Sequence, residues 1–95
     1  MTNYEVMFIV NSTLDDAARN EAIDTVKGII SDNGTLGDVD EWGMRKLAYP
    51  IEKKNEGYYV VIEFQAEPTV PKELDRRLKI MDAIIRHIIV NKDEK

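Results

Sequence analysis

Residues 42–64 read WGMRKLAYPIEKKNEGYYVVIEF, and this stretch decides the fold. It contains two long runs of strand-forming residues around a polar turn at Lys53–Gly57. Pro50 in the first run has no N–H for a central ladder, so we expect that run at a sheet edge. Residues 58–64 alternate as its hairpin partner. The stretch therefore predicts a β-hairpin with one strand at the edge of a sheet.

The flanking residues predict two helices and two further strands. Asn11-Ser12-Thr13 offers an N-cap for the first helix, with Asp15 and Asp16 in its first turn. That helix should end in a left-handed turn at Asn33-Gly34, and Thr69 can cap the second helix. The acidic early part of the second strand, Asp38, Asp40 and Glu41, is expected to project beyond the sheet. The pattern, in chain order, is a strand over 4–10, helical spacing over 14–30, strands over 36–51 and 58–64, helical spacing over 70–81 and a strand over 84–90.

The element order β-α-β-β-α-β predicts an α+β fold of the ferredoxin-like kind. In this split β-α-β arrangement, two helices pack on one face of a four-stranded antiparallel sheet with strand order 4-1-3-2. The apolar first and third strands then take the central positions. The 95 residues, 43% apolar and 33% charged, fit a single domain over 1–95, of which 91–95 form a short polar tail.

Composition excludes several classes of protein. No apolar run approaches the roughly 20 residues that span a bilayer, and Met1–Glu5 has no basic n-region, so we expect neither a membrane span nor a signal peptide. The absence of cysteine excludes disulfides and thiolate metal sites and fits the cytoplasm. The single histidine, His87, excludes a histidine metal cluster. No catalytic motif is present, so we expect no enzyme, cofactor or small-molecule substrate.

Charge is divided unevenly along the chain. Residues 1–41 carry two basic and nine acidic residues, a balance of −7, and residues 42–95 carry eleven basic and nine acidic, a balance of +2. The hairpin places cations near Tyr49 and Tyr58, a mixture suited to RNA because arginine forks onto phosphates and rings accept unpaired bases. A solvated hairpin whose lysines block aggregation is the alternative. The candidate RNA-binding residues are Arg45, Lys46, Lys53, Lys54 and Arg86.

Two helices cover only one face of the sheet, so alternation identifies the side chains on the open face. Glu63 marks the outward set of the third strand. In the last strand we expect Arg86 outward and His87 inward, because arginine is almost never buried unless paired. The sole tryptophan, Trp42, is either a core plug or an interface anchor. The candidate protein-partner interface comprises Trp42 and the open-face cluster Met7, Ile9, Tyr59 and Val61.

Several motifs resemble the family of bacterial small-subunit ribosomal protein six. They are Tyr4-Glu5, Trp42-Gly43-x-Arg45-x-Leu47-Ala48-Tyr49-Pro50-Ile51-x-Lys53, Gly57-Tyr58 and Leu78-x-Ile80-x-Asp82-x-Ile84-x-Arg86. The resemblance covers essentially the whole chain. It implies a ferredoxin-like fold and a structural, non-catalytic role in the small ribosomal subunit. It also implies binding to the central domain of small-subunit ribosomal RNA together with ribosomal protein eighteen, as a heterodimer.

Two other functions fit the same element order. An RNA-recognition motif, a module that binds single-stranded RNA, shares it, but Val61 stands where an aromatic is expected, and the first strand offers Met7 and Ile9 instead of a stacking ring. A ligand-binding regulatory domain would need polar residues that converge on a pocket, and the sequence has no such set. Co-sedimentation with protein eighteen alone would favour the ribosomal interpretation. Partner-free binding to short single-stranded RNA would favour the motif.

Overall fold

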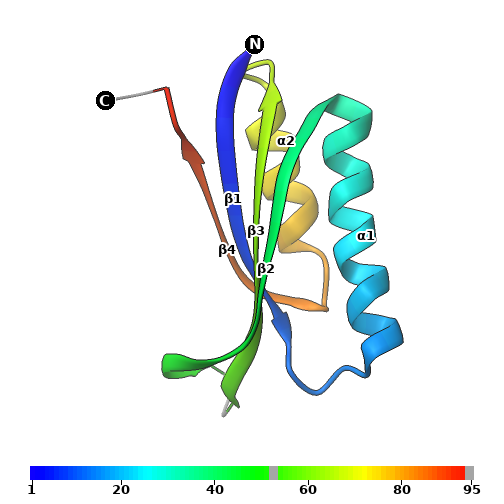
Figure 1. The fold of residues 1–95 in the computed structure, drawn as a ribbon, viewed down its shortest axis with the longest axis vertical. Helices are drawn as coiled ribbons and strands as arrows, with labels where there is room; N and C mark the ends of the chain where they lie inside the picture. Colours follow the sequence, from blue (N-terminus) through cyan, green and yellow to red (C-terminus); the bar gives the residue numbers. More distant parts are fainter. Residues whose placement is uncertain (52–53, 94–95) are drawn as a thin grey trace.

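Four antiparallel strands and two helices follow one another in the predicted order (Figure 1). The computed structural model describes residues 1–51 and 54–93, with side chains described for residues 1–46 and 56–93. The strand order β2-β3-β1-β4 is the predicted order 4-1-3-2 seen from the other edge, so the ferredoxin-like α+β prediction is confirmed. The elements are β1 (Thr2–Asn11), α1 (Asp16–Asn33), β2 (Gly34–Ile51), β3 (Lys54–Ala66), α2 (Val70–Lys79) and β4 (Ile84–Asn91).

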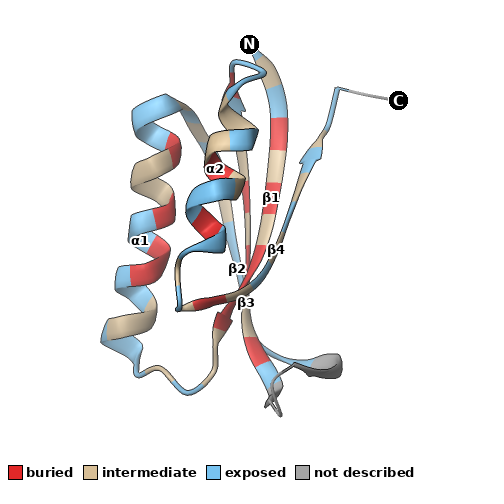
Figure 2. Cartoon of the chain, turned by 180° about the vertical axis from the view of Figure 1, so that it is seen from behind, coloured by how far each residue is buried: buried red, intermediate tan, exposed pale blue. Residues whose placement is uncertain are grey.

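Both helices cover one face of the sheet, and the core lies between the two layers (Figure 2). The central strands β1 and β3 supply the inward set by alternation, with Val6 opposite Ile62 and Phe8 opposite Val60. All four of these side chains are fully buried. The helices contribute the apolar stripes that the sequence predicts, namely Ala22, Ile23, Val26 and Ile30 from α1 and Leu74 and Leu78 from α2.

The ends of the helices differ from their predicted caps. Gly34 is extended, with φ −170° and ψ −153°, so the predicted left-handed turn is wrong. Glycine is needed at this position for another reason, because a Cβ at Gly34 would lie 2.4 Å from the backbone oxygen of Gln65 on β3. Asp15 caps α1 by accepting the Ala18 N–H at 2.8 Å. Thr69 precedes α2 without a side-chain capping bond.

The β2 strand lies at one edge of the sheet, as Pro50 predicts. Its acidic early part does not project beyond the sheet, since Gly34 pairs with Ala66 and Asp40 pairs with Val61. The other end of the β2–β3 ribbon is the part that extends past both helices (Figure 1). The backbone of this acidic part gains ladder hydrogen bonds by pairing with β3. Pairing does not bury the carboxylates, whose side chains remain exposed to solvent.

Candidate functional site

The uncovered face of the sheet carries a row of apolar side chains across its central strands. Met7 on β1 lies opposite Val61 on β3 and opposite Ile88 on β4. Side chains that face each other across strands share one face, so this row lies away from the helices. Ile88 is 43% exposed and Val90 is 46% exposed, while Met7, Tyr59 and Val61 are half-buried. We call this group the sheet patch: Met7, Tyr59, Val61, Ile88 and Val90.

The sheet patch differs from the predicted open-face cluster in two ways. Ile9 lies on the open face but is only 4% exposed, so the expectation that it is accessible is wrong. Its cross-strand neighbours are Tyr59 and Arg86, whose longer side chains flank it on both sides. Ile88 and Val90 also belong to this face and were not among the predicted residues. The signal was available, because alternation in β4 places every second residue after Arg86 on the same face.

Trp42 is not a core plug. Its side chain is among the exposed large apolar groups, at 45% exposure. Its ring stacks on that of Tyr59, with centroids 6.1 Å apart and planes 4° from parallel. The indole Nε1 donates a hydrogen bond to Asp40 Oδ2 at 3.0 Å, so its polar edge is satisfied. The structure thus leaves the interface-anchor alternative open and brings Trp42 beside the sheet patch.

Three of the five candidate RNA-binding residues, Arg45, Lys46 and Arg86, lie in the part of the chain whose side chains are described. Arg45 and Lys46 are exposed on β2, where they pair with Gly57 and Glu56 of β3, and they line one shallow hollow with Trp42 and Tyr59. Arg86 is exposed opposite Ile9, on the open face, as predicted. The remaining candidates, Lys53 and Lys54, fall outside the residues whose side chains are described, as does Tyr49.

Tyr58 does not join the hairpin cations, contrary to expectation. It lies on the helix side of β3, where the Arg19 guanidinium of α1 stands 4.3 Å from its ring centroid. Its hydroxyl donates to Glu41 Oε1 at 3.0 Å. Burial raises the pKa of the Tyr58 hydroxyl, and the Glu41 carboxylate raises it further. This ring therefore joins β2, β3 and α1, and one of its faces is already occupied by the Arg19 guanidinium.

His87 has a structural partner on the helix face. Its Nε2 lies 2.6 Å from Asp75 Oδ1 of α2, and its side chain is 11% exposed. The bond to His87, together with the one to Lys79, lowers the pKa of the Asp75 carboxyl below its ordinary value. The inward placement of His87 is as predicted, and the contact joins β4 to the helix layer.

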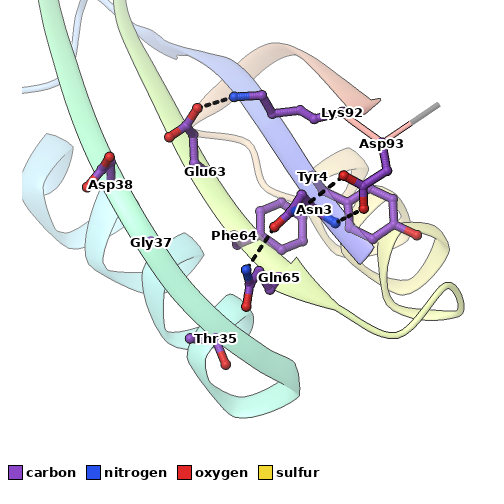
Figure 3. Close-up of a pocket in the computed structure, with 10 residues that line it drawn as sticks. All are labelled: Asn3, Tyr4, Thr35, Gly37, Asp38, Glu63, Phe64, Gln65, Lys92 and Asp93. Carbon is purple, nitrogen blue, oxygen red and sulfur yellow. Dashed lines mark hydrogen bonds and ion pairs between the residues drawn. The ribbon is translucent and has the colours of Figure 1, made fainter. Parts of the chain in front are cut away.

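The other end of the open face is acidic (Figure 3). Lys92 forms an ion pair with Glu63, and this hydrogen bond raises the pKa of the lysine, with Glu5 and Asp38 adding to the effect. The backbone and side-chain amides of Asn3 donate to Asp93 at 2.9 and 3.0 Å and lower the pKa of its carboxyl. Charge is therefore distributed unevenly over the open face, with cations toward the β2–β3 hairpin and carboxylates toward the chain ends.

Two negative findings apply to the described part of the chain. Residues 1–51 and 54–93 contain no group of three or more His, Cys, Asp or Glu side chains placed to hold a metal ion. Within the same residues, neither helix is long and apolar enough to cross a lipid bilayer.

Comparisons with known proteins identify a common family. The family model described as Ribosomal protein S6 matches residues 3–91. A small ribosomal subunit protein bS6 of Alkaliphilus oremlandii is 51% identical over 90 residues, covering 95% of this chain and 96% of that protein. One of Clostridium novyi is 50% identical over 95 residues, covering 99% and 100%. The crystal structure of 30S ribosomal protein S6 from Thermotoga maritima superposes with a TM-score of 0.92 at 34% identity, covering 97% of this chain and 88% of that one.

Proposed function

Since the chain belongs to the ribosomal protein S6 family of the small subunit, we propose that it is a structural, non-catalytic component of the bacterial ribosome, in the cytoplasm. It binds the central domain of small-subunit ribosomal RNA together with ribosomal protein eighteen. The observation that carries this proposal is the uncovered sheet face, on which an apolar patch adjoins a basic hairpin end. One face thereby offers a protein surface and an RNA surface side by side.

The protein surface of this proposal is the sheet patch. Three central residues, Met7, Tyr59 and Val61, come from strands held rigidly by the core, and Ile88 extends the patch onto β4. A continuous apolar group of this kind on a small domain marks a partner surface more often than scattered apolar residues do. Ile9 lies on the same face, between Tyr59 and Arg86, but is almost fully buried. Trp42 borders the patch on its β2 side, next to Tyr59.

The RNA surface is the basic set at the hairpin end. Arg45 and Lys46 are exposed and adjacent, and Arg86 stands in the same cross-strand row as Tyr59 and Ile9. Arginine suits this role because its guanidinium binds a phosphate through two parallel hydrogen bonds. We include Lys53 and Lys54 in the set because they belong to the same basic run of the sequence.

We expect the isolated chain to bind ribosomal RNA poorly and the pair with protein eighteen to bind it well. A net charge of −5 repels a polyanion at long range, and only a few local cations oppose it. A partner that adds basic surface removes this repulsion. Filter binding of a central-domain RNA fragment, with and without the partner, measures the difference. Equal and tight binding by the isolated chain at physiological salt would contradict this expectation and favour an autonomous RNA-recognition motif.

The Arg45→Ala substitution in the assembled pair should weaken RNA binding and also reduce its dependence on salt. Each phosphate contact releases counterions, so losing one should lower the slope of log affinity against log salt by about 0.7–0.9. Arg45→Lys should rescue affinity only in part, because an ammonium group does not reproduce the two-point contact. The control is Lys27→Ala on α1, in the helix layer, which should change neither affinity nor slope. An identical slope for all three variants would place the RNA surface elsewhere.

A further inference from the structure

The β2 edge of the open face holds a stacked aromatic pair, Trp42 and Tyr59. The Trp42 and Tyr59 rings are 4° from parallel, with centroids 6.1 Å apart. In this stacked position the indole Nε1 donates a hydrogen bond to Asp40, which favours this orientation of the ring. With Tyr59 on one side and 45% of its side chain exposed, Trp42 presents ring surface to solvent. The pair is therefore a preformed platform, and a ligand loses little entropy in ordering it.

A bulge in the sheet places Trp42 at this position. Glu41 pairs with Val60 and Gly43 pairs with Tyr59, so Trp42 is the extra residue without a partner on β3. Gly43 has a backbone φ of +85°, a conformation that residues other than glycine adopt only with strain. The bulge frees the indole from the regular alternation of the ladder and sets it beside the Tyr59 ring.

Cations stand next to the platform. Arg45 and Lys46 line the same hollow as the two rings, and no ion-pair partner for either is found among the described residues. The hollow also contains two carboxylates, Asp40 and Glu41. Asp40 accepts the Trp42 N–H and Glu41 accepts the Tyr58 hydroxyl, so both are held by neutral donors of the protein itself. The hollow therefore offers an incoming ligand a flat apolar ring face and two cations that no described residue pairs, while the two carboxylates keep their charge but have their own hydrogen-bond donors.

We propose that the Trp42–Tyr59 platform binds one unpaired nucleobase of the RNA, stacked on Trp42, while Arg45 and Lys46 hold its flanking phosphates. An unpaired nucleotide is the ligand that combines a flat ring with adjacent negative charge, and aromatic rings beside cations are the usual means of holding one. A side chain from a protein partner could cover the rings but would leave the two cations without an anion. The proposal rests on the RNA-binding function proposed above and assigns to Trp42 a nucleotide in place of a protein anchor.

The chain has a single tryptophan, so its fluorescence reports on this site alone. The experiment titrates the assembled pair with the central-domain RNA fragment, after any tryptophan of the partner has been replaced by phenylalanine. Stacking of a base on the indole should quench Trp42 fluorescence in step with binding. RNAs that each lack one base at an unpaired position should then identify the nucleotide. One such abasic RNA should bind without quenching, although its phosphates are unchanged.

Substitutions separate stacking from charge. Trp42→Ala should weaken binding about tenfold to a hundredfold, the range for loss of one stacked base, without changing the salt slope. Trp42→Phe should recover part of the affinity, because a smaller ring still stacks. The matched control is Met44→Ala. Met44 lies on the same strand with nearly the same exposure, 44% against 45% for Trp42, but does not line the hollow, so its loss should leave affinity unchanged. A thermal melt checks that each variant is folded.

Each remaining outcome gives a definite answer. If the pair binds RNA with its normal salt slope and Trp42 fluorescence does not change, the nucleobase site is wrong and the RNA-binding function stands. If the fluorescence changes when the protein partner is added and not when RNA follows, Trp42 belongs to the protein interface. If the pair binds no RNA at all, both the RNA-binding function and the nucleobase site are wrong.

Discussion

Replacing Met7 with aspartate should reduce the affinity for ribosomal protein eighteen by at least about a hundredfold while the domain stays folded. Met7 lies at the centre of the sheet patch, between Val61 and Ile88. Burying an apolar side chain of this size contributes about 1.5–3 kcal/mol to an interface. Aspartate removes that contribution and also places an unpaired carboxylate under the partner, which adds a desolvation cost of similar size. Because every 1.4 kcal/mol is about tenfold in affinity, the two effects together exceed a hundredfold.

Isothermal titration calorimetry of the purified proteins measures this effect. Tyr59→Ala should weaken the pairing as well, by truncating a large ring in the same patch. The control is Ile80→Asp at the end of α2, which adds the same charge to a more exposed apolar residue on the helix side of the domain. Ile80→Asp should pair like the unmodified chain. Normal pairing by Met7→Asp would show that protein eighteen does not use this face.

Replacing the next residue, Phe8, with alanine should destabilise the fold, whereas Met7→Asp should weaken pairing and leave the domain folded. The difference arises because Phe8 belongs to the core. Phe8 is fully buried on the helix side of β1, across from Val60. Truncation of a buried phenylalanine costs about 3–5 kcal/mol, through lost transfer energy and the cavity that remains. A small domain has roughly 5–15 kcal/mol of total stability, so this loss is a large fraction of it. The midpoint of thermal unfolding should fall by more than about 10 °C.

Thermal and urea unfolding, followed by circular dichroism, give the free energy of unfolding for Phe8→Ala. The matched control is Met7→Ala, one position away on the opposite face, which should lose much less stability because Met7 is only half-buried. Of these two neighbouring residues on one strand, Phe8 would contribute to the stability of the fold and Met7 to pairing with the partner. A loss below about 1 kcal/mol for Phe8→Ala would contradict the assignment of the faces, since a true core phenylalanine costs several times more.

The ends of elements show where local sequence patterns were insufficient. Asn33-Gly34 has the composition of a left-handed helix end, yet Gly34 is extended and packs against the backbone of Gln65. That contact joins residues about thirty positions apart, so no local pattern contains it. The acidic early part of β2 shows the same limit, because its pairing with β3 depends on the ladder and not on its own composition.

The sequence by itself determined the order of elements, the edge position of β2, and the inward and outward sets of the central strands. These follow from local physics, because a proline cannot donate to a ladder and alternation has a strict period of two. Only the tertiary structure decided which outward residues are accessible. Ile9 is covered because longer side chains from β3 and β4 flank it, and Trp42 stands on Tyr59 because a bulge shifts the register at Gly43. Exposure and register depend on neighbours that are distant in the chain, and for that reason the open face could be predicted while its accessible surface could not.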